Sequence, residues 1–238
     1  MKPLILALSF LTRLPMPRVA ADEADFAAAI RLYPVAGLVI GAVVAGAGWA
    51  GGHIDPWAGA LAALVAWVWI TGALHLDGLA DLSDGLGAAH GDRTRLLAVM
   101  ADPHIGSFGV VALVIQLLAK LVLLHGLPAT AWPILALIPA AARIGPLVWA
   151  RFLPPLREGG LGALVSRAVR PFDMVAWIVA VLAIGCVYPP LAMTPILALS
   201  LLTWFRRKLG GVTGDVHGAG IELTETGLLI VTLAYWAS

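Results

Sequence analysis

The chain has 238 residues, of which 61% are hydrophobic and only 12% are charged. In soluble globular domains about a quarter of the residues are charged. The composition of this chain therefore excludes a water-soluble domain and indicates an integral membrane protein. The formal net charge of +1 gives no sign of a polyanionic partner, and no nucleic-acid partner is expected. A single cysteine, Cys186, excludes a disulfide or a cysteine-based metal site within the chain.

Seven apolar segments follow one another along the chain, and about 20 helical residues are enough to cross a hydrocarbon core of roughly 30 Å. We therefore predict an all-α fold, a polytopic transmembrane bundle of about seven helices that forms one integral membrane domain over residues 1–238. No polar segment is long enough to form a separate soluble core. The predicted spans are Leu32–Gly51, Pro56–Leu74, Ile105–Gly126, Thr130–Ala150, Met174–Tyr188, Leu191–Phe205 and Leu223–Trp236.

Lysines and arginines gather at alternate ends of these spans. They precede the first span and follow the second, fourth and sixth, whereas the turns Gly51–Asp55, His125–Thr130 and Tyr188–Pro190 contain none. By the positive-inside rule, the N-terminus and the basic loops are expected to be cytoplasmic and the C-terminus external. Two cations fall within spans. The long side chain of Lys120 is expected to extend so that its ammonium group lies at the outer membrane interface. Arg143 is expected to face the bundle interior or a polar cavity.

The second span is followed by HLDGLADLSDGL, residues 75–86. If this stretch is helical, Asp77, Asp81 and Asp84 share an arc of about 60°. Like charges this close repel one another, and carboxylate oxygens are the ligands that Mg²⁺ prefers. We predict that the three aspartates bind Mg²⁺; a helix end with solvated acids is the alternative. His75 points roughly 160° away from them and is expected to cap or to pack.

A glycine-rich loop is predicted before the last span, where residues 210–225 read GGVTGDVHGAGIELTE. Glycines allow a backbone to approach a ligand closely, as phosphate-cradling loops require. The candidate catalytic residues here are the carboxylates of Asp215 and Glu222, with His217 as an acid or base. A glycine-rich turn that only caps the helix is the alternative.

A third polar segment, MADPHIGSFG at residues 100–109, places Asp102 and His104 at the entrance to the third span. These two residues are candidates for substrate binding, and Asp102 alternatively caps the helix. The other candidates for substrate binding are the cations of Arg13, Arg93 and Arg95, which lie in the segments expected to be cytoplasmic.

These motifs resemble those of the cobalamin synthase family, the adenosylcobinamide-GDP ribazoletransferases. The resemblance covers almost the whole chain, in the order of the family, and its motifs are FLTRLPMP (10–17), YPVAGLVIG (33–41), HLDGLADLSDG (75–85), MADPHIGSFG (100–109) and GGVTGDVHGAGIELTE (210–225). It implies a multi-pass enzyme of the inner membrane that needs Mg²⁺ and has its active site on the cytoplasmic side. The implied reaction transfers the adenosylcobinamide phosphate moiety from adenosylcobinamide-GDP to α-ribazole or α-ribazole 5′-phosphate and releases GMP.

The resemblance also assigns residues. The family's acidic stripe falls on Asp77, Asp81 and Asp84, its third-helix entrance on Asp102, and its terminal motif on Asp215 and Glu222. His104 stands where many relatives are expected to carry a basic residue, so the cationic contact to phosphate is assigned to Arg13, Arg93 or Arg95. The choice of base between Asp215, His217 and Glu222 is open.

Two other functions remain as alternatives. DLSDGLGA, residues 81–88, matches the first half of the CDP-alcohol phosphotransferase pattern, but the second half is missing. A cation-coupled transporter would carry its acids near mid-membrane in repeated halves, whereas here most acids are expected at the cytoplasmic edge. Metal-dependent release of GMP would distinguish the transferase from the transporter. Membrane lipid is an expected partner, and the oligomeric state is left open.

Overall fold

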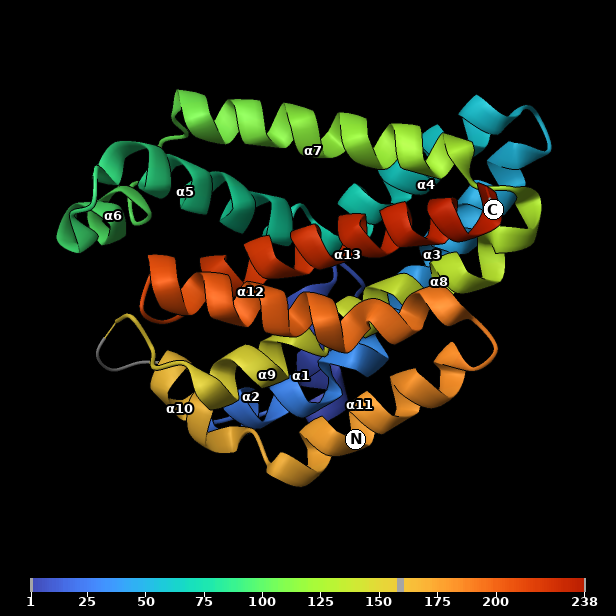
Figure 1. Ribbon diagram of the computed structural model, residues 1–238. Helices are drawn as coiled ribbons and strands as arrows, with labels where there is room; N and C mark the ends of the chain where they lie inside the picture. Colours follow the sequence, from blue (N-terminus) through green and yellow to red (C-terminus); the bar gives the residue numbers. More distant parts are fainter. Residues whose placement is uncertain (1, 158–160, 238) are drawn as a thin grey trace.

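The computed structural model describes residues 2–157 and 161–237. In these residues the chain forms thirteen α-helices and three short 3₁₀ helices, with an isolated β-bridge and no β-strand. The predicted all-α bundle is therefore confirmed (Figure 1). The helices are α1 (Lys2–Leu11), α2 (Glu23–Ala28), η1 (Ala29–Leu32), α3 (Tyr33–Gly52), α4 (Pro56–Thr71), α5 (Leu74–Ala89), α6 (Arg93–Val99), α7 (Ser107–Gly126), η2 (Ala129–Ala131), α8 (Trp132–Ala142), α9 (Gly145–Phe152), α10 (Leu161–Ala168), α11 (Pro171–Gly185), η3 (Pro189–Met193), α12 (Thr194–Lys208) and α13 (Gly214–Ala237).

Three helical stretches are long and apolar enough to cross a membrane, namely Glu23–Gly52, Ser107–Gly126 and Trp132–Phe152. A fourth is added if α4 and α5 count as one broken span. Each of the seven predicted spans contains an α-helix, but α11 and α12 have only 15 residues each. Such helices are about 22 Å long at 1.5 Å per residue, shorter than a hydrocarbon core.

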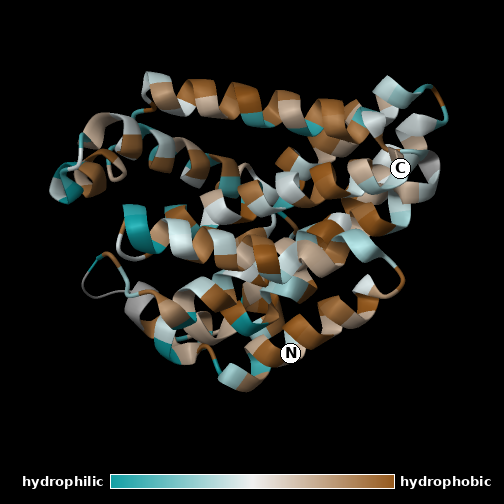
Figure 2. Ribbon diagram, in the orientation of Figure 1, coloured by the Kyte–Doolittle hydropathy of each residue, from teal (hydrophilic) through white to brown (hydrophobic). Residues whose placement is uncertain are grey.

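The outer faces of several helices carry large apolar side chains. Exposed apolar surface of this extent is typical of a contact with lipid or with another apolar partner. Figure 2 shows α7 as predominantly hydrophobic, whereas hydrophilic residues gather around α6 and near the ends of α10 and α12. The exposed apolar residues include Trp57, Leu61, Val65 and Trp69 on α4, Phe108, Val111, Ile115, Leu118 and Val122 on α7, and Phe172, Val175, Val179 and Leu182 on α11.

The second predicted span ends earlier than expected, because α4 stops at Thr71 and α5 leaves it at an angle of 84°. Gly72 and Ala73 both have left-handed backbone, with φ of 58° and 60°. Glycine adopts this conformation without a steric penalty and commonly ends helices, whereas Ala73 pays roughly 1–2 kcal/mol for it. The bend turns the aspartate-bearing helix α5 away from the axis of α4.

The predicted glycine-rich loop is wrong from Gly214 onward, because these residues form the start of α13. The glycines serve a close approach of α13 to α5. A Cβ atom on Gly78 would lie 2.6 Å from the backbone oxygen of Asp215, and one on Gly218 would lie 3.3 Å from the Cα atom of His75. Small residues at such contacts let two helix backbones pack directly. The same packing brings the polar residues of α5 and α13 together.

Candidate active site

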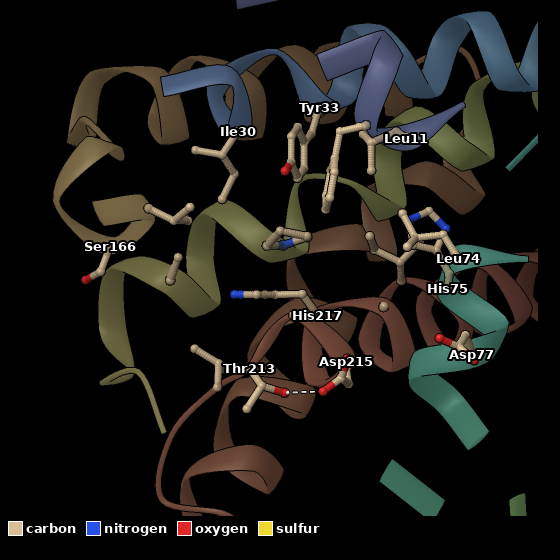
Figure 3. A pocket seen from close by; sticks show the side chains of 18 of the residues that line it. Leu11, Ile30, Tyr33, Leu74, His75, Asp77, Ser166, Thr213, Asp215 and His217 are labelled. Carbon is tan, nitrogen blue, oxygen red and sulfur yellow. Dashed lines mark hydrogen bonds between the residues drawn. The ribbon is translucent and has the colours of Figure 1, made fainter. Parts of the chain in front are cut away.

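A cavity of about 270 Å³ lies where α1, α2, α5, α9, α10 and the start of α13 meet. Figure 3 shows Leu11, Ile30 and Tyr33 on one side and Thr213, Asp215 and His217 facing them, with His75 and Asp77 contributed by α5. A mainly apolar cavity with a few convergent polar groups is typical of a ligand site. Its other lining residues include Phe10, Phe26, Leu74, Pro146, Ala150, Leu153, Val165, Ser166, Val212, Gly214, Gly218 and Ile221.

Carboxylates from α5 and α13 lie close enough to act on one another. Asp81 is half-buried and interacts electrostatically with Asp77 and Asp215, and in the opposite sense with Arg157. Asp215 lies at the start of α13, before the apolar part of that helix. Burial raises the pKa of Asp215; Arg157 and a hydrogen bond from the Thr213 hydroxyl at 3.3 Å oppose this increase, and the charge of Asp77 adds to it. The cluster therefore favours a bound cation.

The donor chemistry of this cluster fits Mg²⁺. No group of three or more His, Cys, Asp or Glu side chains converges as a preformed metal-binding group in the described part of the chain. Mg²⁺, however, is often held by one or two carboxylates, with substrate phosphates and water completing its coordination. Asp77, which borders the cavity, and Asp81, one helical turn further along α5, provide two such carboxylates.

Asp84, the third of the aspartates predicted to bind Mg²⁺, contacts the backbone at the start of α7. It is only 8% exposed, and its two carboxylate oxygens accept hydrogen bonds from the backbone N–H groups of Gly106 at 2.7 Å and Gly109 at 2.9 Å. These donors lie at the first turn of α7, where backbone N–H groups lack partners within the helix. Asp84 therefore caps α7 from a different helix, and its role as a Mg²⁺ ligand stays a prediction.

We expect Asp84→Asn to destabilise the protein by about 1–3 kcal/mol, because the amide keeps one acceptor oxygen and replaces the other with a donor. Thermal unfolding in detergent would measure the loss. Asp77→Asn is the matched control, since Asp77 lies on the same helix with an exposed side chain. Equal unfolding temperatures for Asp84→Asn and the parent would contradict the capping role.

His217 lies in the first turn of α13 and lines the cavity. Burial lowers the pKa of His217 to about 4, so its imidazole is neutral near pH 7. The ring stacks on Trp149 with centroids 6.0 Å apart, and its Nδ1 atom is buried without a hydrogen-bond partner among the described residues. A neutral imidazole with a free nitrogen can accept a proton from a substrate hydroxyl.

Glu222, by contrast, belongs to a buried ion network of Lys120, Arg143, Glu222 and Glu225. Lys120 Nζ lies 2.7 Å from a carboxylate oxygen of each glutamate, and Arg143 Nη1 lies 3.0 Å from Glu225 Oε1. Gln116 donates a further hydrogen bond of 2.8 Å to Glu222. All four charged residues are at most 3% exposed. Glu222 is not among the residues that line the cavity.

The buried ion network tests the two predictions about Lys120 and Arg143, the cations that fall within predicted spans. The expectation that Lys120 reaches the outer interface is wrong, since two glutamates of α13 hold its ammonium group inside the bundle. The expectation that Arg143 faces the interior is confirmed, since its side chain is fully buried. Two positive and two negative charges balance, which makes their joint burial tolerable where a single charge would not be.

Of the predicted substrate-binding arginines, Arg13 lies beside the cluster. It borders a second hollow together with Asp77 and packs over Gly72, at the bend between α4 and α5. Arg157 acts electrostatically on Asp81 and Asp215 and was not singled out from the sequence. In the sequence, only the position of Arg157 in the basic segment after the fourth predicted span pointed to a role for it. Arg13 thus shares a hollow with Asp77, and Arg157 acts on Asp81 and Asp215.

The other predicted substrate-binding residues lie on the surface outside the cavity lining. Arg93 and Arg95 are exposed in the first turn of α6. Asp102 and His104 form an exposed pair, in which the His104 backbone N–H and Nδ1 lie 2.9 Å and 2.7 Å from Asp102 Oδ1. These contacts lower the pKa of Asp102. The alternative that Asp102 caps the third span is wrong, since Asp84 makes that contact.

Together, these observations define an all-helical protein with long apolar helices and a mainly apolar cavity that two carboxylates, Asp77 and Asp215, border. Residues 3–233 match the model of the family described as cobalamin-5-phosphate synthase. The chain is 58% identical over 235 residues to an adenosylcobinamide-GDP ribazoletransferase of Novosphingobium aromaticivorans, covering 97% of this chain and 95% of that protein. Such an enzyme of Thiobacillus denitrificans is 49% identical over 240 residues, covering 97% and 94%. The chain belongs to the cobalamin-5-phosphate synthase family. No solved structure matches it.

Proposed function

We propose that this protein is an adenosylcobinamide-GDP ribazoletransferase of cobalamin biosynthesis. It transfers the adenosylcobinamide phosphate moiety from adenosylcobinamide-GDP to α-ribazole or its 5′-phosphate, and it releases GMP. Family membership and near-full-length identity to relatives of that name support this proposal. The structural observation that carries it is the cavity in which Asp77, Asp215 and His217 meet.

The reaction forms one P–O bond and breaks another. A hydroxyl oxygen of the acceptor attacks the phosphorus attached to the corrinoid, and the bond from that phosphorus to GMP breaks, so that GMP leaves. The hydroxyl proton needs a base near the cavity. We assign this base to His217, with Asp215 beside it; Glu222 is held by Lys120 and Gln116 elsewhere.

The remaining groups bind the phosphates. Asp77 and Asp81 are the residues proposed to hold Mg²⁺. An Mg²⁺ ion bound there would neutralise the negative charge of the substrate diphosphate, including the charge that develops on the leaving phosphate during the reaction. Arg13 and Arg157 are proposed to contact phosphate oxygens, since guanidinium groups bind them with paired hydrogen bonds.

We propose that the site faces the cytoplasmic side of the inner membrane. The basic loops of the sequence and the positive-inside rule support this orientation. A nucleotide substrate from the cytoplasm would then reach the cavity without crossing the bilayer, while the apolar outer faces of α4, α7 and α11 would contact lipid.

The purified protein, in detergent or in liposomes, is expected to release GMP from adenosylcobinamide-GDP when both an acceptor and Mg²⁺ are present. Parallel reactions with α-ribazole and with its 5′-phosphate identify the acceptor. His217→Ala is expected to lower turnover by about 10²- to 10⁴-fold, the usual contribution of a positioned base. Folded parent protein that releases no GMP with either acceptor would contradict the proposed function. Parent-like turnover in His217→Ala would contradict only the choice of base.

A further inference from the structure

His75 connects the cavity with the buried ion network. Its side chain is 3% exposed and lines the cavity next to Leu74 and Asp77 (Figure 3). Its Nδ1 atom lies 3.3 Å from Nη2 of Arg143, and its Nε2 atom is buried with no hydrogen-bond partner among the described residues. A packing role predicted from the sequence explains the burial of this ring but leaves Nε2 unaccounted for.

The contact with Arg143 determines which ring nitrogen carries the proton. A guanidinium group has five N–H donors and no acceptor, so the Nδ1 atom of His75 must accept. The proton of the neutral ring therefore lies on Nε2. A positively charged ring carries a proton on both nitrogens and could not accept this hydrogen bond, so the contact with Arg143 fits only the ring with its proton on Nε2.

Arg143 is itself held in place from two sides. Its Nη1 atom donates to Glu225 Oε1 at 3.0 Å and to the backbone oxygen of Pro139 at 2.8 Å. Glu225 in turn accepts a hydrogen bond of 2.7 Å from Lys120. The position of Nη2, and with it the tautomer of His75, is thus determined by the buried ion network.

We infer that His75 donates a hydrogen bond from Nε2 to a substrate oxygen in the cavity, and that Arg143 is a positioning residue that fixes the required tautomer. This inference rests on the proposed function. An N–H group buried without an acceptor is costly, and an oxygen of a bound substrate removes that cost. Two oxygens offer the same chemistry, a ribose hydroxyl of the acceptor and a phosphate oxygen of the corrinoid nucleotide.

Two substitutions at His75 distinguish the role of its Nε2 atom from that of its Nδ1 atom. The amide of Gln reaches about as far as Nε2 and can donate there, whereas the shorter amide of Asn occupies the place of Nδ1 and leaves no donor at the place of Nε2. We expect His75→Asn to lower kcat/KM by about tenfold or more, and His75→Gln to stay within roughly threefold of the parent. An increase in KM for α-ribazole alone would assign the hydroxyl, and an increase for adenosylcobinamide-GDP alone would assign the phosphate. Parent-like kinetics in both variants would overturn the inference.

Arg143→Lys tests the positioning role. Lysine keeps a positive charge for Glu225 but cannot reach Glu225 and His75 together in the same fork geometry. We expect the same kinetic loss as in His75→Asn, and no further loss when the two substitutions are combined, since they interrupt one interaction. Additive losses would show that Arg143 acts by another route and would overturn its positioning role.

The tautomer can also be measured without any turnover. Two-bond ¹H–¹⁵N spectra of the ¹⁵N-histidine-labelled full-length parent, in detergent or nanodiscs, distinguish Nε2–H from Nδ1–H rings. Assignment uses the resonance missing from the His75 variants. We expect a neutral Nε2–H ring that shifts when one of the two substrates is added. A protonated Nδ1 would overturn the inference even in an active enzyme. An Nε2–H ring in a protein that releases no GMP would instead point to failure of the proposed function.

Discussion

Asp77→Asn and Asp81→Asn are each expected to lower turnover by at least about 100-fold. Each substitution removes one anionic ligand from the pair proposed to hold Mg²⁺, and the ion contributes several kcal/mol of charge stabilisation at about 1.36 kcal/mol per tenfold in rate. Part of the loss should be recovered at high Mg²⁺ if weaker binding is the main defect. GMP release from adenosylcobinamide-GDP, measured across a Mg²⁺ titration, checks both expectations.

These two variants should fold like the parent, because removal of a charge from a cluster of carboxylates relieves repulsion. Asp92→Asn is a suitable control. Asp92 is exposed and caps α6, where its Oδ1 atom accepts a hydrogen bond of 2.8 Å from Thr94, and it is not part of the cavity lining. Parent-like turnover and an unshifted Mg²⁺ midpoint in both Asp77→Asn and Asp81→Asn would place the metal elsewhere.

Lys120→Met is expected to destabilise the protein by about 3–5 kcal/mol, because it leaves buried negative charge without its partner. The volume of the side chain is nearly conserved, so the effect reports charge rather than packing. Chemical or thermal unfolding in detergent measures it. Lys2→Met is the control, since the ion pair of Lys2 with Asp25 lies on the surface, where such pairs contribute little.

A compensating substitution separates charge imbalance from damage to the fold. Lys120→Met combined with Glu222→Gln removes one charge of each sign and restores the neutrality of the buried ion network. The double variant should therefore be more stable than Lys120→Met alone, although hydrogen bonds remain lost. If the double variant is no more stable than Lys120→Met alone, the imbalance of charge is not what destabilises the protein.

The features that could be predicted from the sequence depend on local pattern. Apolar runs of sufficient length are helical in any membrane protein, because the backbone must satisfy its own hydrogen bonds. The helical period predicted that Asp77, Asp81 and Asp84 share one face if the stretch is helical, and α5 does span all three. The resemblance carried by the motifs predicted the family.

Features set by distant contacts were missed. The glutamate that holds Lys120 through a 2.7 Å hydrogen bond is 105 residues away in sequence, and the backbone N–H of Gly106 that Asp84 binds is 22 residues away. The segment from Gly214 resembles a loop because its glycines and polar residues hide the helical period. Only the packing of α5 against α13 shows why small residues are needed there.

The buried ion network also constrains the order in which the helices can pack together. Its cations come from α7 and from the segment after α8, whereas both anions come from α13, which is synthesised after both of them. Until α13 docks, Lys120 and Arg143 have no glutamate beside them, so the earlier helices cannot close around these cations at low cost. The 24-residue helix α13 thus completes the charge balance of the buried ion network, and translation that stops before α13 leaves two uncompensated positive charges among the earlier helices.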